Sequence, residues 1–124
     1  MRSYLLAAAT ALMFAAAPAV AHPKLLSASP APNATVAPAA RVQLTFSEVL
    51  VPKLSGAEVL MTGMPGMAAH APAKMDAKLS LAADRKTLIL TFAKPLPKGS
   101  YRLDWYVVSA DTHRVKGSYV FVVA

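Results

Sequence analysis

The sequence contains no cysteine among its 124 residues. This excludes a disulfide framework, a thiolate nucleophile, a zinc finger and any cysteine-ligated copper or iron–sulfur centre. Acidic residues are also few, since 6 Asp and Glu stand against 13 Lys and Arg, for a formal net charge of +7. The basic residues are scattered and form no run, which argues against a nucleic-acid-binding surface.

The N-terminus accounts for part of the 56% hydrophobic content. Arg2 is followed by an apolar stretch around residues 5–17 and by the small residues Ala19-Val20-Ala21. This order is typical of a secretory signal peptide with an A-x-A cleavage site. A retained membrane anchor is the alternative, but the stretch is shorter than the ~20 apolar residues of a span. We expect cleavage after Ala21, which leaves one domain, residues 22–124, with no membrane insertion.

Apolar and polar residues alternate in short runs along the mature chain, the pattern of strands with one buried face. Proline interrupts the first third of that chain, and no convincing amphipathic helix is present. The runs expected to form strands are residues 24–29, 41–46, 57–61, 79–81, 88–92, 101–107 and 118–123. About seven strands predict an all-β fold, an immunoglobulin-like β-sandwich or barrel, with Tyr101 and Trp105 in its core.

His22 becomes the N-terminal residue once the signal peptide is cleaved. Its α-amine and imidazole then offer two nitrogen donors, and nitrogen-rich tetragonal surroundings favour Cu(II). Because Pro23 has no N–H, the backbone there cannot supply a third nitrogen, and further ligands must come from elsewhere in the fold. The alternative explanation is a cleavage site that merely happens to precede a histidine.

Asp111-Thr112-His113 stands between the last two expected strands. In an extended chain, residues i and i+2 point to the same side, so the Asp111 carboxylate and the His113 imidazole would converge on one ion. Together with His22 they form a nitrogen-and-oxygen donor set for copper. The alternative is a turn aspartate beside a surface histidine.

Every methionine outside the signal peptide falls between Met61 and Met75, with Met64 and Met67 at intervals of three from Met61. Glycine and proline between them oppose a helix, so the segment predicts a loop. Thioethers are soft donors that suit Cu(I), and a loop can gather several around one ion, with His70 as a further donor. The alternative, methionine as a filler of core gaps, explains their concentration in one loop poorly.

Five segments stand out together: HPKL at 22–25, FSE at 46–48, MTGMPGM at 61–67, VVSADTH at 107–113 and GSYVF at 117–121. In this combination the mature chain resembles the CopC-type periplasmic copper-binding proteins of bacterial copper handling. The resemblance implies a small Greek-key β-sandwich in the periplasm, with a Cu(II) site at one end and a methionine-rich Cu(I) site at the other.

The resemblance also implies roles for single residues. His22 would bind Cu(II) through its amine and imidazole, His113 through a second imidazole and Asp111 through a carboxylate oxygen. Glu48 matches a family glutamate near this site, either as a ligand or as a group that orients others. The implied Cu(I) donors are Met61, Met64, Met67 and Met75, with His70 beside them.

The leading hypothesis is a non-enzymatic copper carrier, and the resemblance implies a membrane copper transporter or a multicopper oxidase as its partner. An enzyme is the alternative, because an N-terminal histidine paired with a second histidine resembles the copper brace of oxidative polysaccharide-cleaving enzymes. The anionic Asp111 and the small mature chain favour the carrier. A third hypothesis is an immunoglobulin-like adhesion or assembly module whose metal ligands are incidental.

Overall fold

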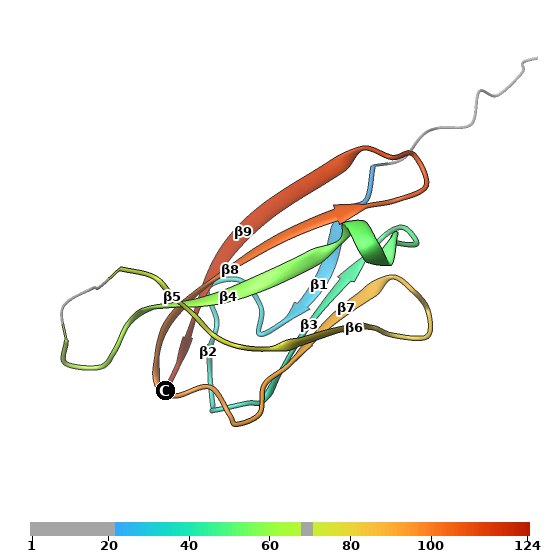
Figure 1. The fold of residues 1–124 in the computed structure, drawn as a ribbon. Helices are drawn as coiled ribbons and strands as arrows, with labels where there is room; N and C mark the ends of the chain where they lie inside the picture. The colour runs from blue at the N-terminus through green and yellow to red at the C-terminus, as the bar shows by residue number, and fades with distance from the viewer. Residues whose placement is uncertain (1–21, 68–70) are drawn as a thin grey trace, which may run out of the picture.

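Nine strands form two facing sheets in the computed structural model, which describes residues 22–67 and 71–124 (Figure 1). The first sheet has the order β1-β3-β7-β6, made of β1 (Leu25–Ser29), β3 (Arg41–Phe46), β7 (Thr87–Thr91) and β6 (Lys78–Leu81). The second has the order β2-β9-β8-β4-β5, made of β2 (Thr35–Val36), β9 (Arg114–Val123), β8 (Gly99–Val108), β4 (Gly56–Gly63) and β5 (Ala73–Lys74). The chain is therefore an all-β sandwich, as predicted.

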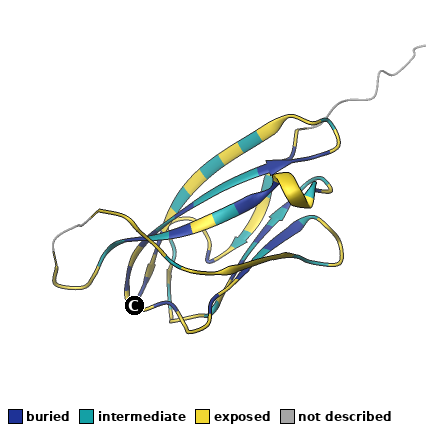
Figure 2. Ribbon diagram, viewed as in Figure 1, coloured by how far each residue is buried: buried dark blue, intermediate teal, exposed yellow. Residues whose placement is uncertain are grey.

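The core lies between the inner faces of the two sheets (Figure 2). In β3 every second residue is buried, and Phe46 at its end meets Trp105 of β8 edge to face, with ring centroids 5.0 Å apart. Tyr101 stacks on Phe121 of the neighbouring strand at 5.3 Å. Burial of each such large side chain stabilises the fold by about 1.5–3 kcal/mol. Tyr101 is fully buried and Trp105 packs partly buried against the same core, in agreement with their predicted place.

The strand pattern differs from the prediction in two places. Residues 61–75 were expected to form a loop throughout, but β4 continues to Gly63 and β5 pairs with it, so the segment is a hairpin. The last strand begins at Arg114 rather than Ser118, because it pairs with β8 as far as Val108. Gly117 stands where an apolar residue would continue the alternation begun by Val115, so the period-2 pattern is too short to identify the start of this strand.

The connections gather at two opposite ends of the sandwich (Figure 1). One end, here the histidine end, carries the start of the described chain, the β8–β9 loop, the 3₁₀ turn η1 (Pro52–Leu54) and the β6–β7 turn. The other, the methionine end, carries the β4–β5 connection. Residues 1–21, the expected signal peptide, and His70 lie outside the described residues. Within the described ranges, no helix has the length and apolar character needed to cross a membrane.

Candidate metal centre

Backbone contacts hold the first residues of the described chain against the sandwich. The ring of Pro23 is fully buried, which fixes the chain beside His22. The amide of Lys24 donates a hydrogen bond to Ser47 Oγ at 2.8 Å, and the amide of Ser47 donates to the Lys24 carbonyl at 2.9 Å. His22 is thereby placed at the histidine end, next to the loop that follows β3.

The β8–β9 loop is anchored where it leaves β8. The amide of Val108 donates to the buried Ser55 Oγ at 3.1 Å, and the amide of Val51 donates to the Val108 carbonyl at 2.7 Å. Leu50 forms an isolated antiparallel bridge with Ser109. These bonds tie the start of the loop to the segment around η1, so the residues that follow Ser109 leave from a fixed point.

Asp111, Thr112 and His113 lie in the β8–β9 loop, where the chain turns and is not extended as the i, i+2 argument assumed. The Thr112 amide donates to the Ser109 carbonyl at 2.9 Å, and Thr112 has a φ of 65°, in the left-handed region. Asp111 Oδ1 accepts hydrogen bonds from Ser109 Oγ at 2.9 Å and from the His113 amide at 3.1 Å. The expected convergence of Asp111 and His113 therefore occurs, but a side-chain-capped turn produces it rather than strand alternation.

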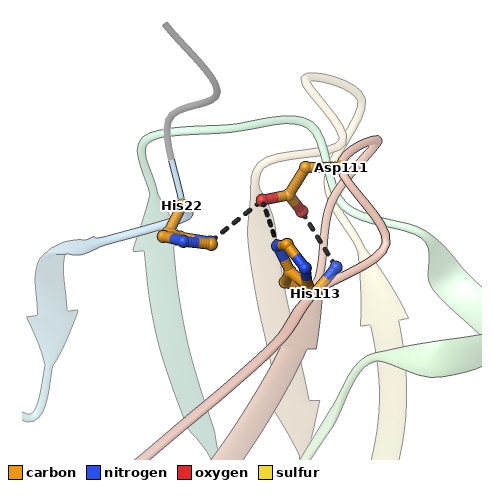
Figure 3. Close-up of side chains that lie close together, drawn as sticks. All are labelled: His22, Asp111 and His113. Atoms are coloured by element: carbon orange, nitrogen blue, oxygen red, sulfur yellow. Dashed lines mark hydrogen bonds and ion pairs between the residues drawn. The ribbon is translucent and has the colours of Figure 1, made fainter.

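His22, Asp111 and His113 come together at one point (Figure 3). The Nδ1 atom of His22 lies 2.9 Å from Asp111 Oδ2, and the Nδ1 atom of His113 lies 3.6 Å from the same oxygen. The two imidazole rings are tilted by 52° with centroids 5.1 Å apart. One ligand atom from each residue falls within 4.8 Å of the others, a separation that a single metal ion can bridge.

The Asp111 carboxylate forms the base of this cluster, with a side chain only 6% exposed. Desolvation raises its pKa, but the hydrogen bonds from Ser109 and His113 and the nearby His22 outweigh it, so the net pKa is lowered. Oδ2 is buried and, despite its closeness to the imidazoles, accepts no hydrogen bond within the described chain. A buried, ionised oxygen that accepts no hydrogen bond and lies 2.9 and 3.6 Å from two imidazole nitrogens fits a bound cation.

Glu48 is not brought into the cluster. It is half-buried and directly follows Ser47 at the histidine end, but the group of converging ligand atoms contains only His22, Asp111 and His113 among the described residues. Its predicted role as a group that orients others stays a prediction.

The methionines divide into two groups at the other end of the sandwich. Met64 and Met67, 42% and 63% exposed, share a turn in which the Met67 amide donates to the Met64 carbonyl at 3.1 Å. Met61 is 9% exposed within the core, and Met75 packs against that core partly buried. The structure thus places two thioethers on the surface and two facing inward.

Three residues that position the centre were not identified as such from the sequence. Ser47 accepts a hydrogen bond from the segment that begins with His22, and Ser109 donates one to Asp111 in the loop that carries His113. The buried Pro23 ring fixes the backbone next to His22. Each lies within one of the segments on which the family resemblance rests, and that resemblance was the sequence signal that could have identified them. Their roles depend on contacts between segments distant in sequence.

Two facing sheets with an imidazole–carboxylate cluster among the loops at one end define an immunoglobulin-like β-sandwich with a candidate metal centre. The chain belongs to the CopC domain family, whose model matches residues 25–124. The match begins after His22, so it carries no information on that residue.

Close relatives extend this assignment. The chain is 55% identical to copper resistance protein C of Xanthomonas campestris pv. juglandis over 91% of its own length and 88% of the relative's. The crystal structure of PcoC, a methionine-rich copper resistance protein from Escherichia coli, superposes with a TM-score of 0.76 at 44% identity, covering 84% of this chain and all of PcoC. That of CopC from Methylosinus trichosporium OB3b gives 0.69 at 29% identity, covering 82% and 93%. The predicted family and fold are confirmed, and the family is one of copper-binding carriers rather than enzymes.

Proposed function

We propose that this protein is a periplasmic copper carrier that holds Cu(II) at the histidine end and Cu(I) at the methionine end. The observation that carries the proposal is the buried, unsatisfied Asp111 Oδ2 facing the Nδ1 atoms of His22 and His113. The names of its relatives as copper resistance proteins support copper as the cargo.

The Cu(II) ligands are the two imidazoles, the Asp111 carboxylate and, after cleavage behind Ala21, the α-amine of His22. This set is rich in nitrogen and carries one negative charge, which suits Cu(II). Asp111 is ionised at neutral pH, and its lowered pKa strengthens this state, so it brings its charge to the ion without first losing a proton. Glu48 then acts beside the centre rather than in it.

The Cu(I) donors are thioethers of the β4–β5 connection. Met64 and Met67 are the main donors because their side chains are exposed on one turn. Met61 and Met75 contribute less, since their packing against the core competes with an ion at the surface. His70, outside the described residues, is proposed as a further donor.

Two sites of different ligand softness select different oxidation states of copper. A change of oxidation state then favours release from one end and capture at the other, or by a partner. We propose a membrane copper transporter or a multicopper oxidase as that partner. An N-terminal signal, residues 1–21, would deliver the chain to the periplasm.

Titration of the exported protein with Cu(II), and with Cu(I) under reductant, against a competing chromophoric chelator tests this function. The paired substitution Met64→Leu and Met67→Leu conserves side-chain volume and is expected to weaken Cu(I) binding at least tenfold while Cu(II) binding stays unchanged. His113→Ala is expected to do the reverse. Loss of both ions in either variant contradicts two separate sites, and copper binding weaker than about −8 kcal/mol, micromolar affinity, contradicts the carrier function.

A further inference from the structure

A groove opens at the histidine end between η1 and the β6–β7 hairpin. Its hollow of about 330 Å³ is lined by Pro52, Leu79, Leu81 and Leu88, with Arg85 at the turn. Within the described chain β6 is an edge strand of its sheet, so this side of the sandwich is open.

The groove exposes apolar side chains that belong to the inner face. Leu79 pairs with the core residue Leu90, and directly paired residues of neighbouring strands share a face. Leu79 therefore points inward, yet it is 45% exposed. Leu54 of η1, two residues after the lining Pro52, is 54% exposed. Covering such side chains removes apolar surface from water, which makes the groove a favourable place for an incoming apolar group.

Arg85 lines the groove, and two further cationic residues belong to the elements that border it. Lys53 lies in η1, and Arg85 and Lys86 lie in the β6–β7 turn; among the described residues none of the three forms an ion pair. The one acidic residue of the turn, Asp84, is engaged locally: it accepts hydrogen bonds from the Lys86 amide at 2.9 Å and from Thr87 Oγ1 at 3.2 Å. An apolar hollow with a cationic rim is complementary to an apolar side chain flanked by carboxylates.

Backbone contacts join the groove to the metal centre. The Leu50 amide donates to the Arg85 carbonyl at 2.9 Å, and Leu50 in turn bridges Ser109. Ser109 Oγ donates to Asp111 at 2.9 Å. A molecule seated in the groove would therefore lie at the same end of the sandwich as the centre, on a surface that backbone contacts connect to it (Figure 1).

We propose that this groove is the docking site of a partner protein that inserts an apolar side chain flanked by acidic residues. Docked there, the partner has its own copper ligands next to the histidine end. The copper-exchange role rests on the proposed function, whereas docking itself requires no metal. A concave hollow of this size admits a side chain, and a flat lipid surface would leave it unfilled.

The probe is a capped pentapeptide, Glu-Glu-Leu-Glu-Glu, added to isotope-labelled, metal-free exported protein and followed by amide chemical shifts. We expect saturable shifts at Lys53, Leu54 and residues 79–86, with a dissociation constant on the order of 1 mM. Peptides with glutamine for glutamate, or serine for leucine, should bind at least fivefold more weakly. Leu79→Ser should weaken binding at least fivefold, whereas the matched change Val120→Ser, at an exposed valine of β9, should leave it unchanged.

Shifts spread over lysines of the whole surface, or equal effects of Leu79→Ser and Val120→Ser, overturn the docking site. If the protein sediments with phosphatidylglycerol vesicles but the peptide causes no saturable shifts, the groove binds a lipid surface instead. This result also overturns the proposal. Copper titration of the same sample separates the two claims. Intact copper binding without peptide binding refutes docking alone, and peptide binding without copper binding refutes only the carrier function.

Discussion

The Nδ1 atom of His22 lies 2.9 Å from Oδ2 of Asp111, although the two residues stand near opposite ends of the segment 22–124. The same oxygen is the buried acceptor that receives no hydrogen bond in the described part of the chain. Closure of the sandwich thus brings the expected new N-terminus to an ionised carboxylate. In the uncleaved precursor the nitrogen of His22 is an amide, so on this account the full Cu(II) ligand set exists only after export and cleavage.

Asp111→Asn tests the contribution of the carboxylate. Asparagine keeps the Oδ1 atom that accepts from Ser109 and His113 but removes the negative charge at the second oxygen. We expect Cu(II) affinity to fall at least tenfold, about 1.4 kcal/mol, with Cu(I) affinity unchanged. Asp104→Asn is the matched control, because it removes the same charge from β8 at a residue paired with Arg102 and Ser118. Equal effects of both variants would mean that Asp111 acts only through the overall charge.

Ser47→Ala tests the positioning of the N-terminus. The change removes the oxygen that accepts the Lys24 amide, and a hydrogen bond of this kind contributes about 0.5–1.5 kcal/mol. We expect a two- to tenfold loss of Cu(II) affinity, measured by chelator competition, because His22 is held less firmly. Ser118→Ala is the control, because it removes a hydroxyl of β9 that donates to Asp104 of β8. It should leave the Cu(II) affinity unchanged. An unchanged Ser47→Ala protein would show that Pro23 alone fixes the segment.

Gly117→Ala tests the packing of Trp105 on β9. A Cβ at Gly117 would overlap the indole ring of Trp105, whereas a Cβ at Gly63 meets nothing within 4 Å. We expect Gly117→Ala to destabilise the fold by about 1–3 kcal/mol and to alter the tryptophan emission, since the indole must move. Gly63→Ala should leave both properties nearly unchanged. Urea unfolding followed by fluorescence measures them together, and equal stabilities of the two variants would contradict the described packing.

Asp84 is expected to account for part of the loss of folding stability at low pH. The Lys86 amide lowers its pKa and, although desolvation acts in the opposite sense, the Thr87 hydroxyl adds to the lowering, so the net pKa is below normal. A lowered folded-state pKa contributes stability above the unfolded pKa of about 3.9, and that contribution is lost as pH falls through the folded value. Asp84→Asn should therefore be less stable than the parent at pH 6, and the difference should shrink below about pH 4. A difference that stays constant down to pH 2 in urea unfolding would contradict this origin.

Much of the fold could be predicted because the strands carry a clear period. The alternation in β3 and β8 identified buried faces, and the longer strands correspond to the expected runs. The two-residue strands β2 and β5 could not be predicted, since each exists only through pairing with β9 or β4. The early start of β9 was missed for the same reason, because its first residues follow the register of β8.

The residues of the candidate site could be predicted from the sequence, but their geometry could not. The position of His22 behind the cleavage motif and the Asp-x-His spacing named three residues that the structure brings together. The turn at Thr112, with its φ of 65°, and the hydrogen bonds from Ser47 and Ser109 arise from tertiary contacts that no local pattern encodes. The inward packing of Met75 was likewise hidden, because loop composition does not reveal which thioethers face the core.

The most direct test of the account compares the mature protein beginning at His22 with a version that carries one added glycine before it. The extension turns the His22 nitrogen into an amide and leaves the His22 side chain, Asp111 and His113 in the chain. We predict tight Cu(II) binding with a nitrogen-rich tetragonal electron paramagnetic resonance signal for the first protein. The second should bind at least a hundredfold more weakly, with a changed signal. Identical affinities and spectra would contradict the central claim, because His22 would then not hold copper through its terminal amine.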